Sequence, residues 1–269
     1  MTRRPTWRGV IASACLVMAA YASFLVVLAP ATLLDAGLRR ATTGKLRLAQ
    51  AHGSLWSGSG RLEIRHGAGS GGVGKDLSWT LQPRALWRGR LDFEVAIDHA
   101  DRGFPVRISA HGIDISNVDF SLPASALGIA VPRMATLGPR GDLDFQIARF
   151  SRAGDTVSAD AAVTWKEASS ALTPVAPLGT YELRVHGAGG LLNATLRTDS
   201  GPLHLDGGGS WRGDGPATFS ATARVDAEHR SQLAPLLRLI AVERGNGDFV
   251  LQFSPPLGGV SAGARTGNY

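Results

Sequence analysis

The sequence has only one cysteine, Cys15, among its 269 residues. An internal disulfide is therefore excluded, and a part of the chain that works outside the cytoplasm must gain its stability by burying apolar side chains. The seven histidines never stand two or four positions apart, and no second thiol accompanies them. The spacing of a zinc or other metal site is thus missing, and we expect neither a metal nor another cofactor.

Complete catalytic motifs are also lacking. Residues 69–75 have the spacing of a phosphate-binding loop, but Asp76 stands where a hydroxyl would bind magnesium, and a strand pattern follows instead of a helix. Residues 67–72 match the sequence pattern of a dinucleotide-binding fingerprint. No helical pattern follows them either, so this interpretation is rejected. Residues 259–263 resemble a nucleophile elbow, but neither His nor Asp follows them. The sequence predicts that the protein is not an enzyme.

Lysine is scarce, and the excess of positive charge is small and scattered. The chain has 28 Lys plus Arg against 22 Asp plus Glu, a formal net charge of +6. Without Arg3, Arg4 and Arg8 the basic count falls to 25, which leaves +3 for the rest. Basic and acidic residues are interspersed instead of clustered, so we expect no nucleic-acid partner.

The longest uniform feature is a run without charged side chains, residues 9–34, which directly follows Arg3, Arg4 and Arg8. A helix rises about 1.5 Å per residue, so about 20 apolar residues cross a hydrocarbon core about 30 Å thick. Basic flanks stay in the cytoplasm. We therefore predict a single-pass anchor in a bacterial inner membrane, with the N-terminus in the cytoplasm and the bulk of the chain in the periplasm. The residues expected to contact membrane lipid are Val10, Leu16, Val17, Phe24, Leu25, Val26, Val27 and Leu28.

Two other interpretations of the run stay open. Ala29-Pro30-Ala31 resembles the small-residue cleavage site of a secretory signal, although residues 10–28 are longer than the usual apolar region of about 7 to 15 residues. A lipoprotein modified at Cys15 would need a longer apolar stretch before that cysteine. Both alternatives would still place the bulk of the chain outside the cytoplasm.

From Leu46 onward the dominant period is two. Apolar Leu91, Phe93, Val95 and Ile97 alternate with charged or small residues, which on a strand puts all four on one face. Similar alternation recurs in residues 77–81, 104–108, 143–147, 157–165, 181–185, 219–225 and 249–253. Glycine-rich or proline-rich segments separate these runs, and no helical pattern intervenes, which indicates antiparallel strands.

One segment departs from this pattern. In residues 233–242, leucine and isoleucine recur at helical spacing, and Pro235 is compatible with a helix if it lies in the first turn. With so few helices, the apolar face of the sheet must be covered by the sheet itself. The predicted fold is therefore mainly β: a strongly curved antiparallel sheet, either a sandwich or an open, taco-like half-barrel, with one short amphipathic helix near the C-terminus.

The domain organisation follows from these patterns. We expect a basic cytoplasmic tail in residues 1–8, the transmembrane anchor in 9–34, a juxtamembrane linker in 35–45, a β-rich periplasmic domain in 46–254 and a flexible tail in 255–269.

Short blocks at the start of the β-rich region carry a family resemblance. The first block is Gly53-Ser-Leu55-Trp56-Ser-Gly58, and the residues that follow in the second block are Trp79, Leu81, Pro83, Leu86 and Gly89. In this order they resemble the type II secretion system protein N family, which joins an inner-membrane anchor to a periplasmic β domain. The resemblance implies a non-enzymatic accessory subunit of the machinery that moves folded proteins across the outer membrane. Its implied partners are the inner-membrane platform or the outer-membrane channel.

The matched residues allow two roles. In the structural role, Gly53 and Gly58 supply turns with positive φ. Leu55 and Trp56 fill the core, and Trp79 and Leu81 point to the same side of the sheet as these two residues. In the docking role, Trp56, Trp79 and Trp87 form an aromatic patch for another secretion component, because tryptophan is enriched at binding hot spots.

A different class of function also stays open. The long rows of apolar alternating positions would suit an AsmA-like lipid-handling protein whose sheet forms a groove for acyl chains. A filled core and an open groove share the same sequence pattern.

Overall fold

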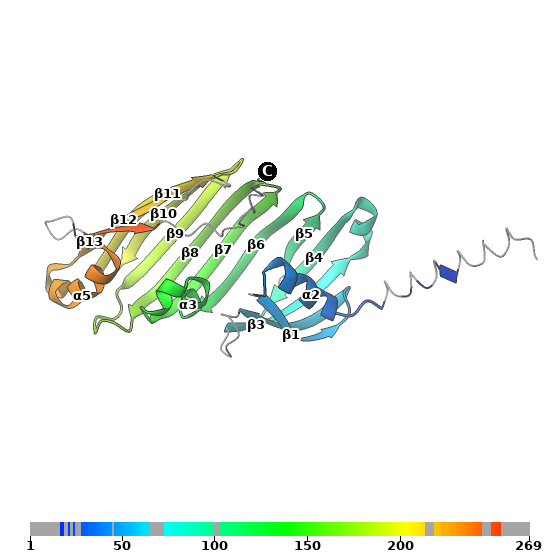
Figure 1. The fold of residues 1–269 in the computed structure, drawn as a ribbon, viewed down its shortest axis with the longest axis horizontal. Helices are drawn as coiled ribbons and strands as arrows, with labels where there is room; N and C mark the ends of the chain where they lie inside the picture. The colour runs from blue at the N-terminus through cyan, green and yellow to red at the C-terminus, as the bar shows by residue number, and fades with distance from the viewer. Residues whose placement is uncertain are drawn as a thin grey trace, which may run out of the picture. The chain divides into compact units, whose positions relative to one another are not determined.

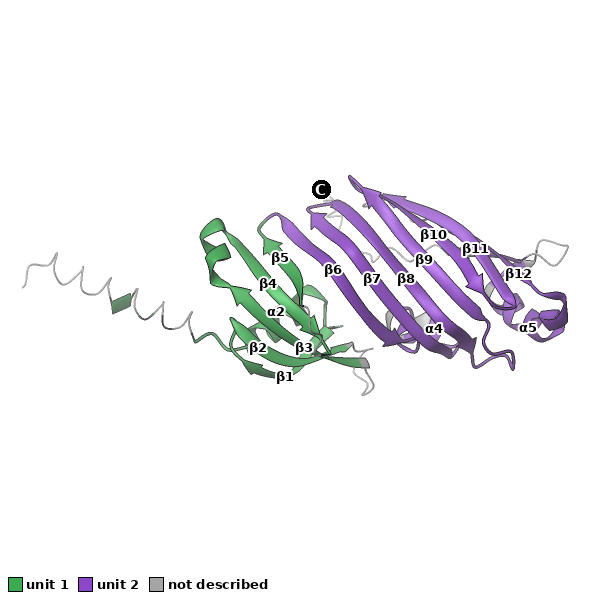
Figure 2. Ribbon diagram, turned by 180° about the vertical axis from the view of Figure 1, so that it is seen from behind, with its two compact units in different colours: residues 1–110 green, residues 111–269 purple. Residues whose placement is uncertain are grey.

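The computed structural model describes residues 17, 18, 21, 24, 28–44, 46–64, 73–98, 103–212, 218–243 and 249–253. The chain divides into two compact units, unit 1 with residues 1–110 and unit 2 with residues 111–269 (Figure 2). The predicted β-rich domain, residues 46–254, includes parts of both units.

Unit 1 is an antiparallel sheet with one helix packed on it (Figure 1). Its strand order is β1-β2-β3-β4-β5, so each strand pairs with the next strand along the chain. Its elements are α2 (Thr32–Ala41), β1 (Leu46–Gly53), β2 (Ser57–Ile64), β3 (Val73–Gln82), the 3-10 helix η1 (Pro83–Arg88), β4 (Arg90–Ile97) and β5 (Phe104–Ser109).

The glycine-rich segment between β2 and β3 connects two paired strands. Ile64 lies opposite Val73, and both Lys75 and Asp76 lie within β3. Residues 65–72 themselves lie outside the described part of the chain. The prediction that this segment leads into a strand, and not into a phosphate-binding helix, is confirmed.

Helix α2 covers part of the apolar face of the unit 1 sheet. Trp79, Leu81 and Phe93 are buried beneath it, and Leu34 and Leu38 of the helix pack against this cluster. The carboxylate of Asp35 holds the helix to β1, because its Oδ1 accepts a hydrogen bond of 2.9 Å from the Leu48 N–H. Residues 35–45, expected as a linker, thus contain most of a helix that belongs to the fold of unit 1.

Unit 2 is a longer antiparallel sheet, in which β6 to β12 form a meander (Figure 1). Its strand order is β6-β7-β8-β9-β10-β11-β12-β14-β13. Its elements are β6 (Gly112–Pro123), α3 (Ala126–Ala130), α4 (Pro132–Ala135), β7 (Pro139–Ala153), β8 (Thr156–Ser170), β9 (Gly179–Ala188), β10 (Leu191–Ser200), β11 (Leu203–Arg212), β12 (Thr218–Val225), η2 (Ala227–His229), α5 (Arg230–Ile240), β13 (Val242–Glu243) and β14 (Phe249–Phe253).

The described strands do not form a closed sheet. Among the described residues, β1 and β13 are the first and last in the strand order, and each pairs with a strand on one side only. The mainly β, antiparallel fold and the short C-terminal helix were predicted correctly. The cover of the sheets was not: we expected the sheet to fold over itself, but helices form the cover in both of the apolar cores described here. Short helices between strands escaped the sequence pattern because they are too brief to show a helical period.

The core of unit 2 lies where α5 meets β11, β12 and β14. Leu233 and Leu237 are its most deeply buried large side chains, and they pack with Ala223 and Phe249 of the sheet. The helix begins at Arg230, directly after η2, so Pro235 lies in its interior and not in the first turn as predicted. An interior proline removes one backbone hydrogen bond. Its position is exposed, so water can solvate the carbonyl that loses its partner.

Within the described residues, no helix has the length and apolar composition needed to cross a membrane. Val17, Phe24 and Leu28 of the predicted span are described, and each is more than half exposed. The other residues predicted for the anchor and its topology lie outside the described part: Arg3, Arg4, Arg8, Val10, Leu16, Leu25, Val26 and Val27. The predicted tail 255–269 lies outside it as well.

We predict that Leu233→Ala lowers the free energy of unfolding of unit 2 by about 2–5 kcal/mol, because it empties a fully buried position under α5. Leu239→Ala, on the same helix at 64% exposure, should change it by less than about 0.5 kcal/mol. Urea unfolding of the purified full chain, followed by circular dichroism, measures both. Equal losses would show that α5 does not cover the sheet as described.

Candidate functional site

The first family block forms a tight turn, residues 53–58, between β1 and β2. Gly53 takes φ +89°, a left-handed conformation in which a side chain would be strained. The N–H of Ser54 donates to the Ser57 carbonyl at 2.9 Å, and the Ser54 hydroxyl accepts from the N–H groups of Trp56 and Ser57, each at 3.2 Å. Its own hydrogen bonds therefore fix the conformation of this turn.

The Trp79 indole lies against the turn and fixes its position on the sheet. It is 3% exposed, and its Nε1–H donates to the Ser54 carbonyl at 3.2 Å. Gly58 faces Trp79 across the β2–β3 pair, and a Cβ at Gly58 would stand 2.5 Å from the Trp79 ring. The glycine is thus needed for the close approach of the ring, whereas we had expected a positive φ at this residue.

The turn also holds the chain that leads out of the predicted membrane span. The Leu55 N–H donates to the Ala29 carbonyl at 2.8 Å, and the Ala31 N–H donates to the Gly53 carbonyl at 3.3 Å. Pro30 forms an isolated antiparallel bridge with Ser54. Both alanines are buried. This junction was not predicted from the sequence, although Pro30 inside the predicted helical span was the signal for a break in the helix.

The second family block adjoins the turn through β3. The Leu81 N–H donates to the Trp56 carbonyl at 2.6 Å. The 3-10 helix η1 then runs from Pro83 to Arg88, and Gly89 caps it with φ +67°. The structure therefore gathers the predicted motif residues in one region of unit 1: Gly53, Leu55, Trp56, Gly58, Trp79 and Leu81 around the turn, and Pro83, Leu86 and Gly89 beside it.

The three tryptophans do not share one exposed surface. Trp79 is buried, Trp56 is half-buried against the unit 1 core, and Trp87 is 95% exposed on η1. Trp79 thus belongs to the core, and Trp87 is the indole that a partner can reach.

Unit 2 presents a second candidate surface, an apolar sheet face. Strand register places apolar residues opposite one another across five strands, in the row Phe120, Phe145, Val163, Leu183 and Leu196. The rings of Phe120 and Phe145 stack with centroids 4.7 Å apart. All five side chains of this row are only half-buried, and Leu196 at its end packs against the core that α5 covers. We call this row the apolar row.

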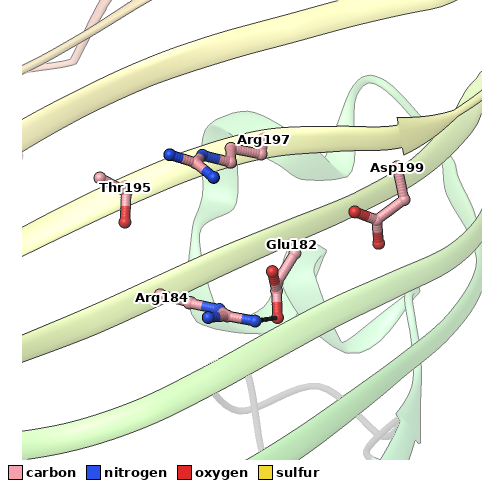
Figure 3. Close-up of a pocket in the computed structure, with 5 residues that line it drawn as sticks. All are labelled: Glu182, Arg184, Thr195, Arg197 and Asp199. Carbon is pink, nitrogen blue, oxygen red and sulfur yellow. Dashed lines mark ion pairs between the residues drawn. The ribbon is translucent and has the colours of Figure 1, made fainter.

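The opposite face of the same strands is polar. Glu182, Arg184, Thr195, Arg197 and Asp199 line a shallow pocket between β9 and β10 (Figure 3). The Arg184 guanidinium pairs with Glu182 at 2.9 Å, and this hydrogen bond raises the pKa of Arg184. The lining holds neither His nor Cys, and the described chain has no group of three or more His, Cys, Asp or Glu that could hold a metal ion. These side chains are suited to a solvated, charge-balanced surface.

We predict opposite effects for two glycine substitutions in unit 1. Gly58→Ala should lower its free energy of unfolding by about 1–3 kcal/mol, because the new methyl group would meet the Trp79 ring and the His52 carbonyl. Gly37→Ala, in α2 with no atom within 4 Å of the new Cβ, should raise it by about 0.5–1 kcal/mol. Thermal unfolding monitored by tryptophan fluorescence compares the two, and a destabilising Gly37→Ala would contradict the described position of α2.

Comparison with known proteins identifies the family. A family model described as "Type II secretion system (T2SS), protein N" matches residues 44–252. No curated protein and no solved structure matches the chain. The matched region runs from just before β1 into β14, and so includes the turn at 53–58, η1 and strands of both units. The chain therefore belongs to the type II secretion system protein N family.

Proposed function

We propose that this protein is a non-enzymatic subunit of the type II secretion system, anchored in the inner membrane by its charge-free N-terminal run and exposed to the periplasm with its bulk. It supports the transport of folded proteins across the outer membrane through contacts with the inner-membrane platform or the outer-membrane channel. The observation that carries this proposal is the family match over residues 44–252, which includes most of both units.

The junction at residues 29–31 supports an anchor that is retained. Cleavage after Ala31 would remove Ala29 and Ala31, both buried, together with their two hydrogen bonds to the turn. An uncleaved chain keeps these contacts and connects the span directly to the folded unit. The span then ends at Leu28, because Pro30 pairs with Ser54 and α2 begins at Thr32.

The edge strands favour contacts through side-chain surfaces over strand addition. β1 has an irregular register between Ala49 and His52, and Gln50 there takes φ +50°. β13 consists of two residues, Val242 and Glu243. Bulged and very short edges are poor templates for another strand. The partner surfaces are therefore sought on the exposed faces and turns.

The anchor can be tested by releasing the periplasmic part. The cut has to precede Ala29, since a later cut would remove residues that pack on the unit 1 core. We predict that a chain whose residues 1–28 are replaced by a cleavable signal folds in the periplasm but restores secretion poorly in a strain that lacks the gene. Secreted enzyme activity and protease resistance of the periplasmic chain measure the two properties.

Crosslinking of the full anchored chain in cells supplies the partner test. We expect affinity purification after crosslinking to recover an inner-membrane platform or outer-membrane channel subunit, and the released chain to recover less of it. Full secretion by the released chain would refute the role of the anchor. Recovery of no secretion component by the anchored chain would refute the proposed function as a whole.

Lipid handling is a second candidate function, favoured by one observation. The apolar row is in register across five strands, and its side chains are only half-buried in the described structure. A contiguous apolar row whose side chains stay partly accessible is a candidate surface for binding lipid or protein.

A pair of substitutions on β8 tests this second function. Val163→Glu places a carboxylate in the apolar row, and Ala162→Glu places one on the opposite face of the same strand. If acyl chains occupy the row, we predict that Val163→Glu removes most of the lipid that co-purifies with the released chain, because burying a charge against an acyl chain is costly. Native mass spectrometry measures bound lipid. Equal lipid content in the two variants would exclude the row as a lipid site.

A further inference from the structure

Trp87 is the most exposed large apolar side chain in the described part of the protein, at 95%. It does not project from an irregular loop. Pro83 begins η1, Gly89 caps its C-terminal end with φ +67°, and Ala85 is buried on the inner side of the helix. Because Ala85 takes the inward position, Leu86 and Trp87 are directed outward. The fold therefore presents the indole to the surroundings at a fixed place in unit 1.

A short chain of contacts connects η1 to the end of the predicted span. The Ala29 carbonyl accepts from Leu55 at 2.8 Å, and the neighbouring Trp56 carbonyl accepts from Leu81 at 2.6 Å. η1 begins at Pro83, two residues after Leu81 and directly after the end of β3.

The charge of η1 is positive only. Arg84 and Arg88 are exposed, no acidic residue occurs in the helix, and neither arginine has an ion pair with another described residue. The next arginine, Arg90, pairs with Asp92 at 3.6 Å. Tryptophan is enriched at the headgroup level of membranes, and arginine is attracted to anionic lipids. An exposed indole between two unpaired arginines, close to the end of a membrane span, combines these features.

We propose that η1 rests on the periplasmic surface of the inner membrane, with Trp87 at the headgroup level and Arg84 and Arg88 on anionic headgroups. This inference depends on the anchor in the proposed function. The span and η1 would then hold unit 1 at two points, which restricts its rotation about the end of the span and sets its orientation toward partner subunits.

Tryptophan quenching in reconstituted vesicles tests the contact. The full chain is placed in vesicles of phosphatidylcholine and phosphatidylglycerol, with or without brominated acyl chains. The emission of the wild type minus that of Trp87→Phe gives the Trp87 signal, which should fall about twofold with brominated lipid if the indole lies at the interface. The same subtraction with Trp7→Phe gives the signal of an indole beside the predicted span.

The two signals separate the two claims. Quenching of Trp7 without quenching of Trp87 overturns the η1 contact and leaves the anchor intact. If neither tryptophan is quenched, both the η1 contact and the anchor are overturned. Quenching of both, reduced for Trp87 by the double variant Arg84→Glu with Arg88→Glu, supports the contact and the role of the arginines. Arg84, Trp87 and Arg88 are exposed, so substitutions at these positions of η1 should not disturb folding.

A protein partner for Trp87 is the competing occupant. A photo-reactive amino acid placed at position 87 in cells should yield lipid adducts if η1 rests on the membrane. Crosslinks to a secretion subunit in place of lipid would overturn the proposal.

Discussion

Every sheet in this protein has one apolar and one polar face, and the need to cover the apolar face is the constraint on which the rest of the structure depends. Strict alternation along β3 puts Trp79 and Leu81 on the same side, and α2 covers them. In unit 2, α5 covers the corresponding side of β11, β12 and β14. Elsewhere in unit 2 the apolar row is only half-buried, and its Leu196 packs against the α5 core. Burial of apolar area is the main source of stability here, since a chain with one cysteine has no disulfide.

The turn at residues 53–58 converts this general constraint into a specific junction. Its backbone geometry needs Gly53, and its contact with the Trp79 ring needs Gly58. The same turn hydrogen-bonds to residues 29 and 31 on one side and to Leu81 on the other. One short block thereby ties the N-terminal segment, the sheet and the start of η1 together. In the proposed function, this junction connects the anchor to unit 1.

Much of the fold could be predicted from alternation alone. Leu91, Phe93, Val95 and Ile97 occupy β4 as expected, and the runs at 143–147 and 219–225 lie in β7 and β12. Antiparallel pairing followed from the glycine-rich connections, one of which joins β2 to β3. The helix near the C-terminus was found from its leucine spacing, but its start was placed too late because Pro235 was taken as a marker of the first turn. Surface exposure at that position makes an interior proline tolerable.

The family block was equally visible in the sequence, but its roles were not. Sequence reasoning grouped Trp56, Trp79 and Trp87 by residue type, whereas burial separates them. That α2 covers the apolar face of the unit 1 sheet was not predicted, because the first residues of α2 lie in the run assigned to the membrane span. The sequence by itself determined the strands, their apolar faces and the family, since period-two alternation and short motifs are local properties of the chain. Only the tertiary structure decided which tryptophan is exposed and where residues 29–31 attach, because both depend on contacts between segments distant in sequence.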